Sequence, residues 1–169
     1  MYYIGIDLGG TNIAGGLVNE DGKIIAHKSI PTLKERGMDA ICQDMIQLCK
    51  EFVKENNLTK EEIHSVGVGT PGFIDPNNGI IIYTNNIDVK NFELKKTMNE
   101  ALDIPVFVGN DADCAALGEA TAGSAKGCNN AIILTLGTGV GGGIIIDKKI
   151  FSGSFPGGGE LGHQVIIQG

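Results

Sequence analysis

The spacing of apolar residues along the chain predicts both strands and helices. Short apolar runs bounded by Gly, Pro, Asn or Asp predict strands. These runs are residues 3–8, 13–19, 23–29, 65–69, 80–83, 105–109, 131–136 and 144–147. Apolar side chains at helical spacing predict helices. These segments are residues 38–56, 93–102 and 112–122, with a short helical piece at 59–63.

The order of these elements favours a mixed sheet. Three strands form a meander before the first helix, and strands and helices alternate after it. Strict β-α-β alternation would predict an all-parallel sheet, so the opening meander adds antiparallel strands to it. The sequence therefore predicts an α/β fold with a mixed sheet and helices on its faces.

Composition and charge limit the classes of partner. The 169 residues are 42% hydrophobic, and the net charge of −7 is accompanied by no cluster of Lys or Arg. No nucleic acid and no acidic membrane is therefore expected as a partner. With no basic leader and no apolar run of membrane-spanning length, we expect a cytoplasmic protein. The four cysteines show no ligand-like pairing and are expected to be buried free thiols.

A glycine turn follows the first strand. Asp7 precedes Gly9, Gly10 and Thr11. Glycines let backbone N–H groups approach a ligand closely, and successive amides in such a turn form a concavity that suits phosphate. Asp7 is placed to hold a cation that accompanies the phosphates. Taken alone, the stretch fits a hairpin with a polar tip equally well.

The glycine turn has a counterpart later in the chain. Residues 136–139 read Leu-Gly-Thr-Gly and are followed by a second glycine-rich apolar run, as residues 8–11 are. Gly137, Gly139 and Gly142 also match G-x-G-x-x-G, but a strand continues where a dinucleotide-binding turn must open a helix, so that interpretation is rejected. Two similar units, each with a phosphate-sized turn, indicate a nucleotide held between two lobes.

Four motifs in order make the chain resemble the ROK sugar kinases, within the actin-like, sugar kinase and heat-shock ATPase superfamily. They are residues 7–11 (DLGGT), 109–112 (GNDA), 136–143 (LGTGVGGG) and 159–163 (GELGH). The resemblance implies an RNase H-like (actin-like ATPase) fold, with a five-stranded mixed sheet and flanking helices in residues 1–123 and the start of a second lobe in 124–169. It also implies ATP and Mg²⁺ as cofactors, a hexose substrate and a homodimer of the full-length form.

Asn110 and Asp111 match the catalytic pair of that family. An Asp before a helix is equally a favoured N-cap. The two roles are compatible, because the positive end of a helix favours the ionised carboxylate. The resemblance implies that Asp111 is the general base for in-line phosphoryl transfer. It places the phosphates on Gly9, Gly10, Thr11, Gly137, Thr138 and Gly139, and Mg²⁺ at Asp7.

The resemblance also implies a set of sugar ligands. These are Asn86, Asn110, Asp111, Glu160 and His163. Glu160 and His163 lie three residues apart, which is equally compatible with a polar pair at a helix start. His163 is in addition a ligand of a structural Zn²⁺ in many members. The other zinc ligands, a cysteine cluster expected soon after His163, are absent from this sequence.

Other departures concern the sugar and the extent of the chain. Gly109 stands where Glu is common, Asp113 where Asn is common, and Val89 where an aromatic residue is usual. We expect the sequence to be the first lobe and part of the second lobe of a protein about twice as long. By itself it should bind ATP poorly, transfer no phosphoryl group and expose unpaired strand edges around residues 131–150.

The function expected from the resemblance is ATP-dependent phosphorylation of a hexose, most like a glucokinase that forms glucose 6-phosphate in glycolysis. N-acetylmannosamine, N-acetylglucosamine, fructose and allose remain open as substrates. A non-catalytic sugar-sensing module, as in the repressors of the same family, is the alternative from another class. An ATPase of the actin or chaperone kind is less compatible with Asn110, Asp111, Glu160 and His163.

Overall fold

The chain divides into two compact units. A computed structural model describes residues 1–137, 139–154 and 157–163. The units are Met1–Asp111 and Ala112–Gly169. The lobe boundary expected after residue 123 concerns the complete fold and stays a prediction.

The first unit is built on a five-stranded sheet with the order β3-β2-β1-β4-β8. Its strands are β1 (Tyr2–Leu8), β2 (Asn12–Asn19), β3 (Ile24–Pro31), β4 (Ile63–Thr70) and β8 (Val106–Asn110). β1, β4 and β8 run parallel, whereas β2 pairs antiparallel with both β1 and β3. The mixed five-stranded sheet predicted from the sequence is confirmed.

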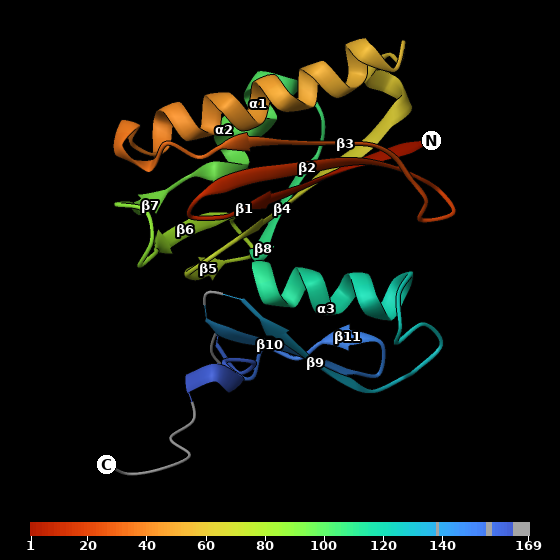
Figure 1. Cartoon of the computed structure of the whole chain (residues 1–169), viewed down its shortest axis with the longest axis vertical. Helices are drawn as coiled ribbons and strands as arrows, with labels where there is room; N and C mark the ends of the chain where they lie inside the picture. The colour runs from red at the N-terminus through yellow and green to blue at the C-terminus, as the bar shows by residue number, and fades with distance from the viewer. Residues whose placement is uncertain (138, 155–156, 164–169) are drawn as a thin grey trace. The chain divides into compact units, whose positions relative to one another are not determined.

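Two helices cover one face of this sheet, α1 (Met38–Glu55) and α2 (Leu94–Leu102) (Figure 1). The residues of α1 that recur at helical spacing, from Ile41 to Phe52, form one buried cluster with Ile4, Ile6 and Leu8 of β1. A Cβ at Gly15 of β2 would lie only 2.8 Å from side-chain atoms of Leu48 and Phe52. Glycine is needed there because α1 packs so closely on the strand.

A second, three-stranded sheet in the first unit was only partly predicted. Its order is β5-β6-β7, formed by β5 (Phe73–Asp75), β6 (Ile80–Tyr83) and β7 (Lys90–Phe92). Only β6 was expected, because its partners are three residues long and stand among turn residues. Two 3₁₀ turns, η1 (Lys34–Arg36) and η2 (Lys60–Glu62), complete this unit.

The second unit repeats the opening meander with the order β11-β10-β9. Its elements are α3 (Asp111–Thr121), which begins on the last residue of the first unit, β9 (Ala131–Leu136), β10 (Val140–Ile146), β11 (Lys149–Ile150) and η3 (Leu161–His163). Residues 140–143 were expected to be part of the turn, but they belong to β10. A Cβ at Gly143 would lie 2.4 Å from the Cβ of Ala116, so the glycines bring α3 close to the strand.

The cysteines were predicted only in part. Cys42 and Cys49 are buried, but Cys114 and Cys128 are exposed. The expectation of burial was wrong for these two. Cys114 lies in α3, which buries only its Ala112 and Ala116 side chains, and Cys128 lies in the loop between α3 and β9. Burial raises the pKa of Cys42 to about 11 and that of Cys49 to about 12, so both thiols stay protonated at neutral pH.

Within residues 1–137, 139–154 and 157–163, no helix has both the length and the apolar character needed to cross a membrane.

Candidate active site

The carboxyl ends of three adjacent parallel strands bring the first group of predicted residues together. Asp7 of β1 is in register with Gly69 of β4, which is in register with Gly109 of β8. Thr70 is paired with Asn110 at the next position, and Asp111 then opens α3. Gly69 and Gly109 add no side chains next to Asp7. Ligands bind at this edge of open α/β sheets.

Asp7 and Asp111 are close enough to influence each other. The pKa of Asp7 is raised, first by partial removal of the carboxylate from water and secondly by the negative charge of Asp111. Although the Asp7 residue is exposed, its ionised form is therefore disfavoured. A divalent cation would relieve this repulsion, and Mg²⁺ is commonly held by one or two carboxylates together with phosphate oxygens. The two carboxylates fit that requirement.

The turn at residues 9–11 joins β1 to β2 and is held from inside. The N–H of Gly9 donates to the carbonyl of Asn12 at 2.9 Å. Within the described part of the chain, no hydrogen bond uses the amides of Gly10 or Thr11. Two successive free N–H groups at a glycine turn are what a phosphate oxygen requires.

Thr32 hydrogen-bonds to the backbone of this turn, a contact that the sequence analysis did not predict. Its hydroxyl donates to the carbonyl of Gly9 at 2.7 Å, and its N–H donates to the carbonyl of Thr11 at 2.9 Å. The side chain is fully buried. The sequence carries no signal for this contact, because it depends on the pairing of Asn12 with Pro31 across β2 and β3.

Asn86 lies directly against the glycine turn. It is an exposed residue between β6 and β7. A Cβ built on Gly10 would be 3.3 Å from the Cβ of Asn86. The loop is shaped by Thr84, whose hydroxyl accepts from the N–H of Ile87 and donates to its carbonyl, both at 2.9 Å. The buried side chains of Ile87 and Val89 anchor it in the core.

The second unit places its own predicted residues side by side. Gly137 and Gly139 lie between β9 and β10, and the N–H of Gly137 donates to the carbonyl of Gly139 at 2.9 Å. Thr138 lies outside the described residues. A Cβ at Gly162 would lie 1.8 Å from the carbonyl oxygen of Val140, so the segment carrying Glu160 and His163 packs on the strand that leaves this turn.

Glu160 and His163 form a pair. Nδ1 of His163 is 3.2 Å from a carboxylate oxygen of Glu160, and both side chains are exposed. Together they offer a carboxylate and an imidazole to a ligand with hydroxyl groups. A structural zinc finds no further ligands here, since no group of three or more His, Cys, Asp or Glu side chains suited to a metal occurs among the described residues.

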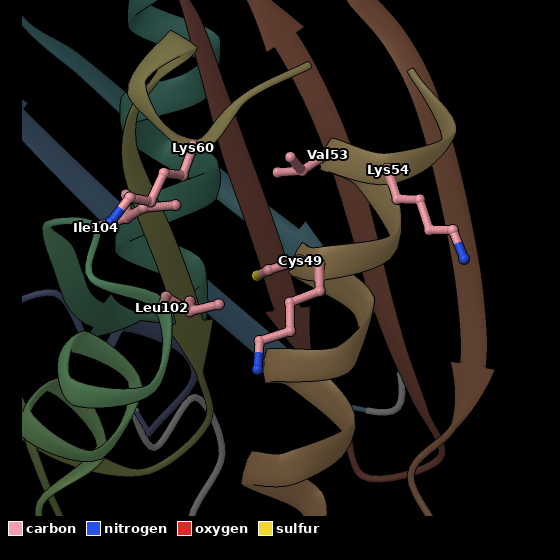
Figure 2. Close-up of a pocket in the computed structure, with 7 residues that line it drawn as sticks. Cys49, Val53, Lys54, Lys60, Leu102 and Ile104 are labelled. Atoms are coloured by element: carbon pink, nitrogen blue, oxygen red, sulfur yellow. The ribbon is translucent and has the colours of Figure 1, made fainter. Parts of the chain in front are cut away.

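A cavity elsewhere in the first unit is not part of this site. It has a volume of about 170 Å³ and is lined by Cys49, Lys50, Val53, Lys54, Lys60, Leu102 and Ile104. Figure 2 shows Cys49 and Val53 pointing towards Leu102 and Ile104, while the ammonium group of Lys54 points away. Lys60 precedes β4 and Ile104 precedes β8. The cavity therefore lies at the amino ends of the strands, opposite Asp7 and Asn110.

The chain is similar to known proteins along almost its whole length. The chain is 37% identical to a glucokinase from Halalkalibacterium halodurans over 166 residues, which cover 98% of this chain and 50% of that protein. It is 32% identical to the xylose repressor of Bacillus spizizenii over 165 residues, 98% of this chain and 42% of the repressor. The chain spans about half the length of the curated relatives that it matches.

A solved structure shows the same fold. The ROK family glucokinase of Streptomyces griseus, in complex with glucose and AMPPNP, superposes with a TM-score of 0.85 and 33% identity, covering 99% of this chain and 51% of that one. The mixed sheet and its helices are thus those of the actin-like ATPase fold of the ROK glucokinases. The model of the ROK family matches residues 3–168, and the chain belongs to this family.

Proposed function

We propose that these residues are part of an ATP-dependent hexose kinase, most like a glucokinase. The observation that carries the proposal is the meeting of Asp7, Asn110 and Asp111 at the carboxyl ends of adjacent parallel strands, beside a glycine turn with two free amides. Carboxylates that can act as a base and hold a metal, together with amides that can bind phosphate, are groups that phosphoryl transfer to a hydroxyl uses. The similarity to glucokinases over almost the whole chain supports the same conclusion.

Each group has a role in this reaction. Asp111 accepts the proton of the sugar hydroxyl that attacks the γ-phosphate, and Asn86, Asn110, Glu160 and His163 hold the sugar. The phosphates lie on the turns at residues 9–11 and 137–139, with Thr138 among their ligands. Mg²⁺ at Asp7 supplies charge neutralisation for the phosphates. Because such a reaction depends on positioning and electrostatics, the rigid strand ends are well suited to it.

The base is tested by Asp111→Asn and Asp111→Ala in the whole polypeptide. Loss of general base catalysis should lower kcat by at least ~10²-fold, while hexose binding weakens less. Asp39→Asn is the matched control, because Asp39 also lies in the first turn of a helix, α1, and is exposed. Turnover of an Asp111 variant at the level of the Asp39 variant would contradict the assignment.

The substrate is best identified by ADP formation with a panel of sugars. Glucose, N-acetylmannosamine, N-acetylglucosamine, fructose and allose are compared at equal concentrations. We expect ADP release to depend on the added hexose, with glucose the preferred substrate.

A structural zinc at His163, a homodimer and a cytoplasmic location are further expectations for the whole polypeptide.

A sugar-sensing module of a repressor is the second candidate, favoured by the 32% identity to a xylose repressor. The same assay distinguishes the two. A sensor binds a sugar, as calorimetry would show, without ADP formation.

A further inference from the structure

Thr32 joins the end of β3 to the glycine turn through both its backbone and its side chain. It follows β3 directly, and its side chain is 0% exposed. The N–H donates to the carbonyl of Thr11 at 2.9 Å, and the hydroxyl donates to the carbonyl of Gly9 at 2.7 Å. Among the described residues, the hydroxyl has no other hydrogen-bond partner, and a buried hydroxyl without a partner would be costly.

The bond to Gly9 fixes more than one atom. The carbonyl of Gly9 and the N–H of Gly10 belong to one planar trans peptide, in which they point in opposite directions. Holding the carbonyl towards buried Thr32 therefore turns the N–H of Gly10 away from the core. Gly10 has no side chain to restrict this peptide, so without Thr32 its orientation would be free to vary.

We propose that Thr32 is a positioning residue of the phosphate site, which sets the direction of the Gly10 amide through the carbonyl of Gly9. This inference rests on the proposed function, because it assumes that the turn receives phosphate. Thr32 itself touches no substrate. Preorganised N–H donors bind an anion more strongly than donors that must first be ordered.

Two variants separate the hydroxyl from the rest of the residue. Thr32→Val keeps the branched shape and the backbone bond to Thr11 but removes the donor to Gly9, whereas Thr32→Ser keeps the donor. In the whole polypeptide we expect Thr32→Val to lower kcat/KM for ATP by about tenfold, as loss of one oriented hydrogen bond would. KM for the hexose should change less than about twofold. Thr32→Ser should restore most of the kcat/KM for ATP.

A matched threonine gives the opposite result. Thr84 uses its hydroxyl to shape the loop that carries Asn86. Thr84→Val should therefore raise KM for the hexose more than KM for ATP. Equal losses for ATP and hexose in both valine variants, with no rescue by serine, would reduce Thr32 to general stability and overturn the inference.

A measurement without catalysis keeps the two proposals apart. Tripolyphosphate is titrated into the ¹⁵N-labelled protein, and the amide signals of Gly10 and Thr11 are followed. We expect both signals to shift in the wild type and in Thr32→Ser. In Thr32→Val the same titration should give a Kd for tripolyphosphate that is about tenfold higher. Tripolyphosphate binding without any hexose-dependent ADP formation would refute the kinase but not this inference. ADP formation at the same rate in all three proteins, with unchanged titrations, would refute this inference but not the kinase.

Discussion

At the scale of single residues, the Asp7 carboxylate combines binding potential with a cost to the fold. Its pKa is raised by loss of water and by the charge of Asp111. A raised pKa in a carboxyl group means that the folded protein disfavours the ionised form. The cost is therefore present at neutral pH and disappears as the pH falls below the pKa of the unfolded state, about 3.9. A bound cation would reverse the sign of this effect.

Asp7→Asn should stabilise the ligand-free protein while abolishing Mg²⁺-dependent ADP formation. The amide keeps the shape of the side chain but carries no charge, so we expect Tm to rise by about 1–2 °C at pH 7, a small gain because solvent screens an exposed group. The gain should shrink towards zero near pH 3. Thermal unfolding at several pH values measures this. Asp21→Asn, a change in the exposed turn after β2, is the control.

Gly10 lets the glycine turn at residues 9–11 and the loop carrying Asn86 approach each other closely. A Cβ there would come within 3.3 Å of the Cβ of Asn86, so the loop must shift by a few tenths of an ångström. Gly10→Ala should raise KM for the hexose by about threefold to tenfold, because small displacements of positioning groups weaken binding. Gly5→Ala on β1, the strand that leads into this turn, is the control, since a Cβ there meets nothing within 4 Å. Equal KM values for the two variants would contradict the contact.

At the scale of elements, the turn carrying Glu160 and His163 depends on Gly162. A side chain there cannot coexist with the carbonyl of Val140, 1.8 Å from the Cβ position. Gly162→Ala should displace the 160–163 segment and weaken hexose binding on the order of 10²-fold, as a displacement near 1 Å does. Isothermal titration with the hexose measures this in the whole polypeptide. Gly118→Ala, where a Cβ meets nothing, should bind the hexose normally.

Periodicity predicted the longer elements, because each carries its own pattern. The apolar spacing of α1 and the glycine turn between β1 and β2 are local features, and both are as expected. β5 and β7 have no such pattern, since their three residues become strands only by pairing with β6. The same holds for Thr32, whose two hydrogen bonds join residues more than twenty positions apart.

The candidate site follows the same division. Asp7 and Asn110 are recognisable as polar residues at strand ends, so their meeting at one edge is a consequence of parallel order. The closeness of Asn86 to Gly10 is different, because it depends on how a loop of irregular structure folds back. No spacing in the sequence encodes that approach.

At the scale of the whole chain, buried apolar side chains are unevenly distributed. The first unit contains the large core that joins β1, β4 and α1. In the described residues of the second unit, the buried hydrophobic side chains are Ala112, Ala116 and Ile145. Stability within a protein follows the density of such contacts.

The rates of amide hydrogen exchange in this 169-residue chain should therefore differ strongly between the two units. We expect amides of β1 and β4 to exchange at least ~100-fold more slowly than those of β9 and β10, since the latter open locally at low cost. Mass spectrometry of peptic fragments measures this. Uniform protection across both units would contradict the prediction.

β9 also offers an exposed apolar edge. Ile132, Leu134 and Leu136 are 66%, 57% and 80% exposed, and among the described strands β9 pairs only with β10. Such an edge favours pairing between chains. We expect this 169-residue chain to self-associate with increasing concentration, and Leu134→Lys to suppress this in sedimentation velocity, whereas Lys23→Ala, at an exposed turn, should not.

The repulsion between Asp7 and Asp111 has a consequence for evolution within the family. The family that contains glucokinases also contains repressors, and a lineage that abandons phosphoryl transfer no longer needs two neighbouring carboxylates. Replacing Asp7 by an uncharged residue then removes the electrostatic cost that its raised pKa reflects, with no loss of a needed activity. Selection for stability alone would remove this pair of carboxylates. Regaining the activity would then require a substitution that destabilises the fold. Position 7 is therefore where a family member that has lost phosphoryl transfer should first differ from the kinases.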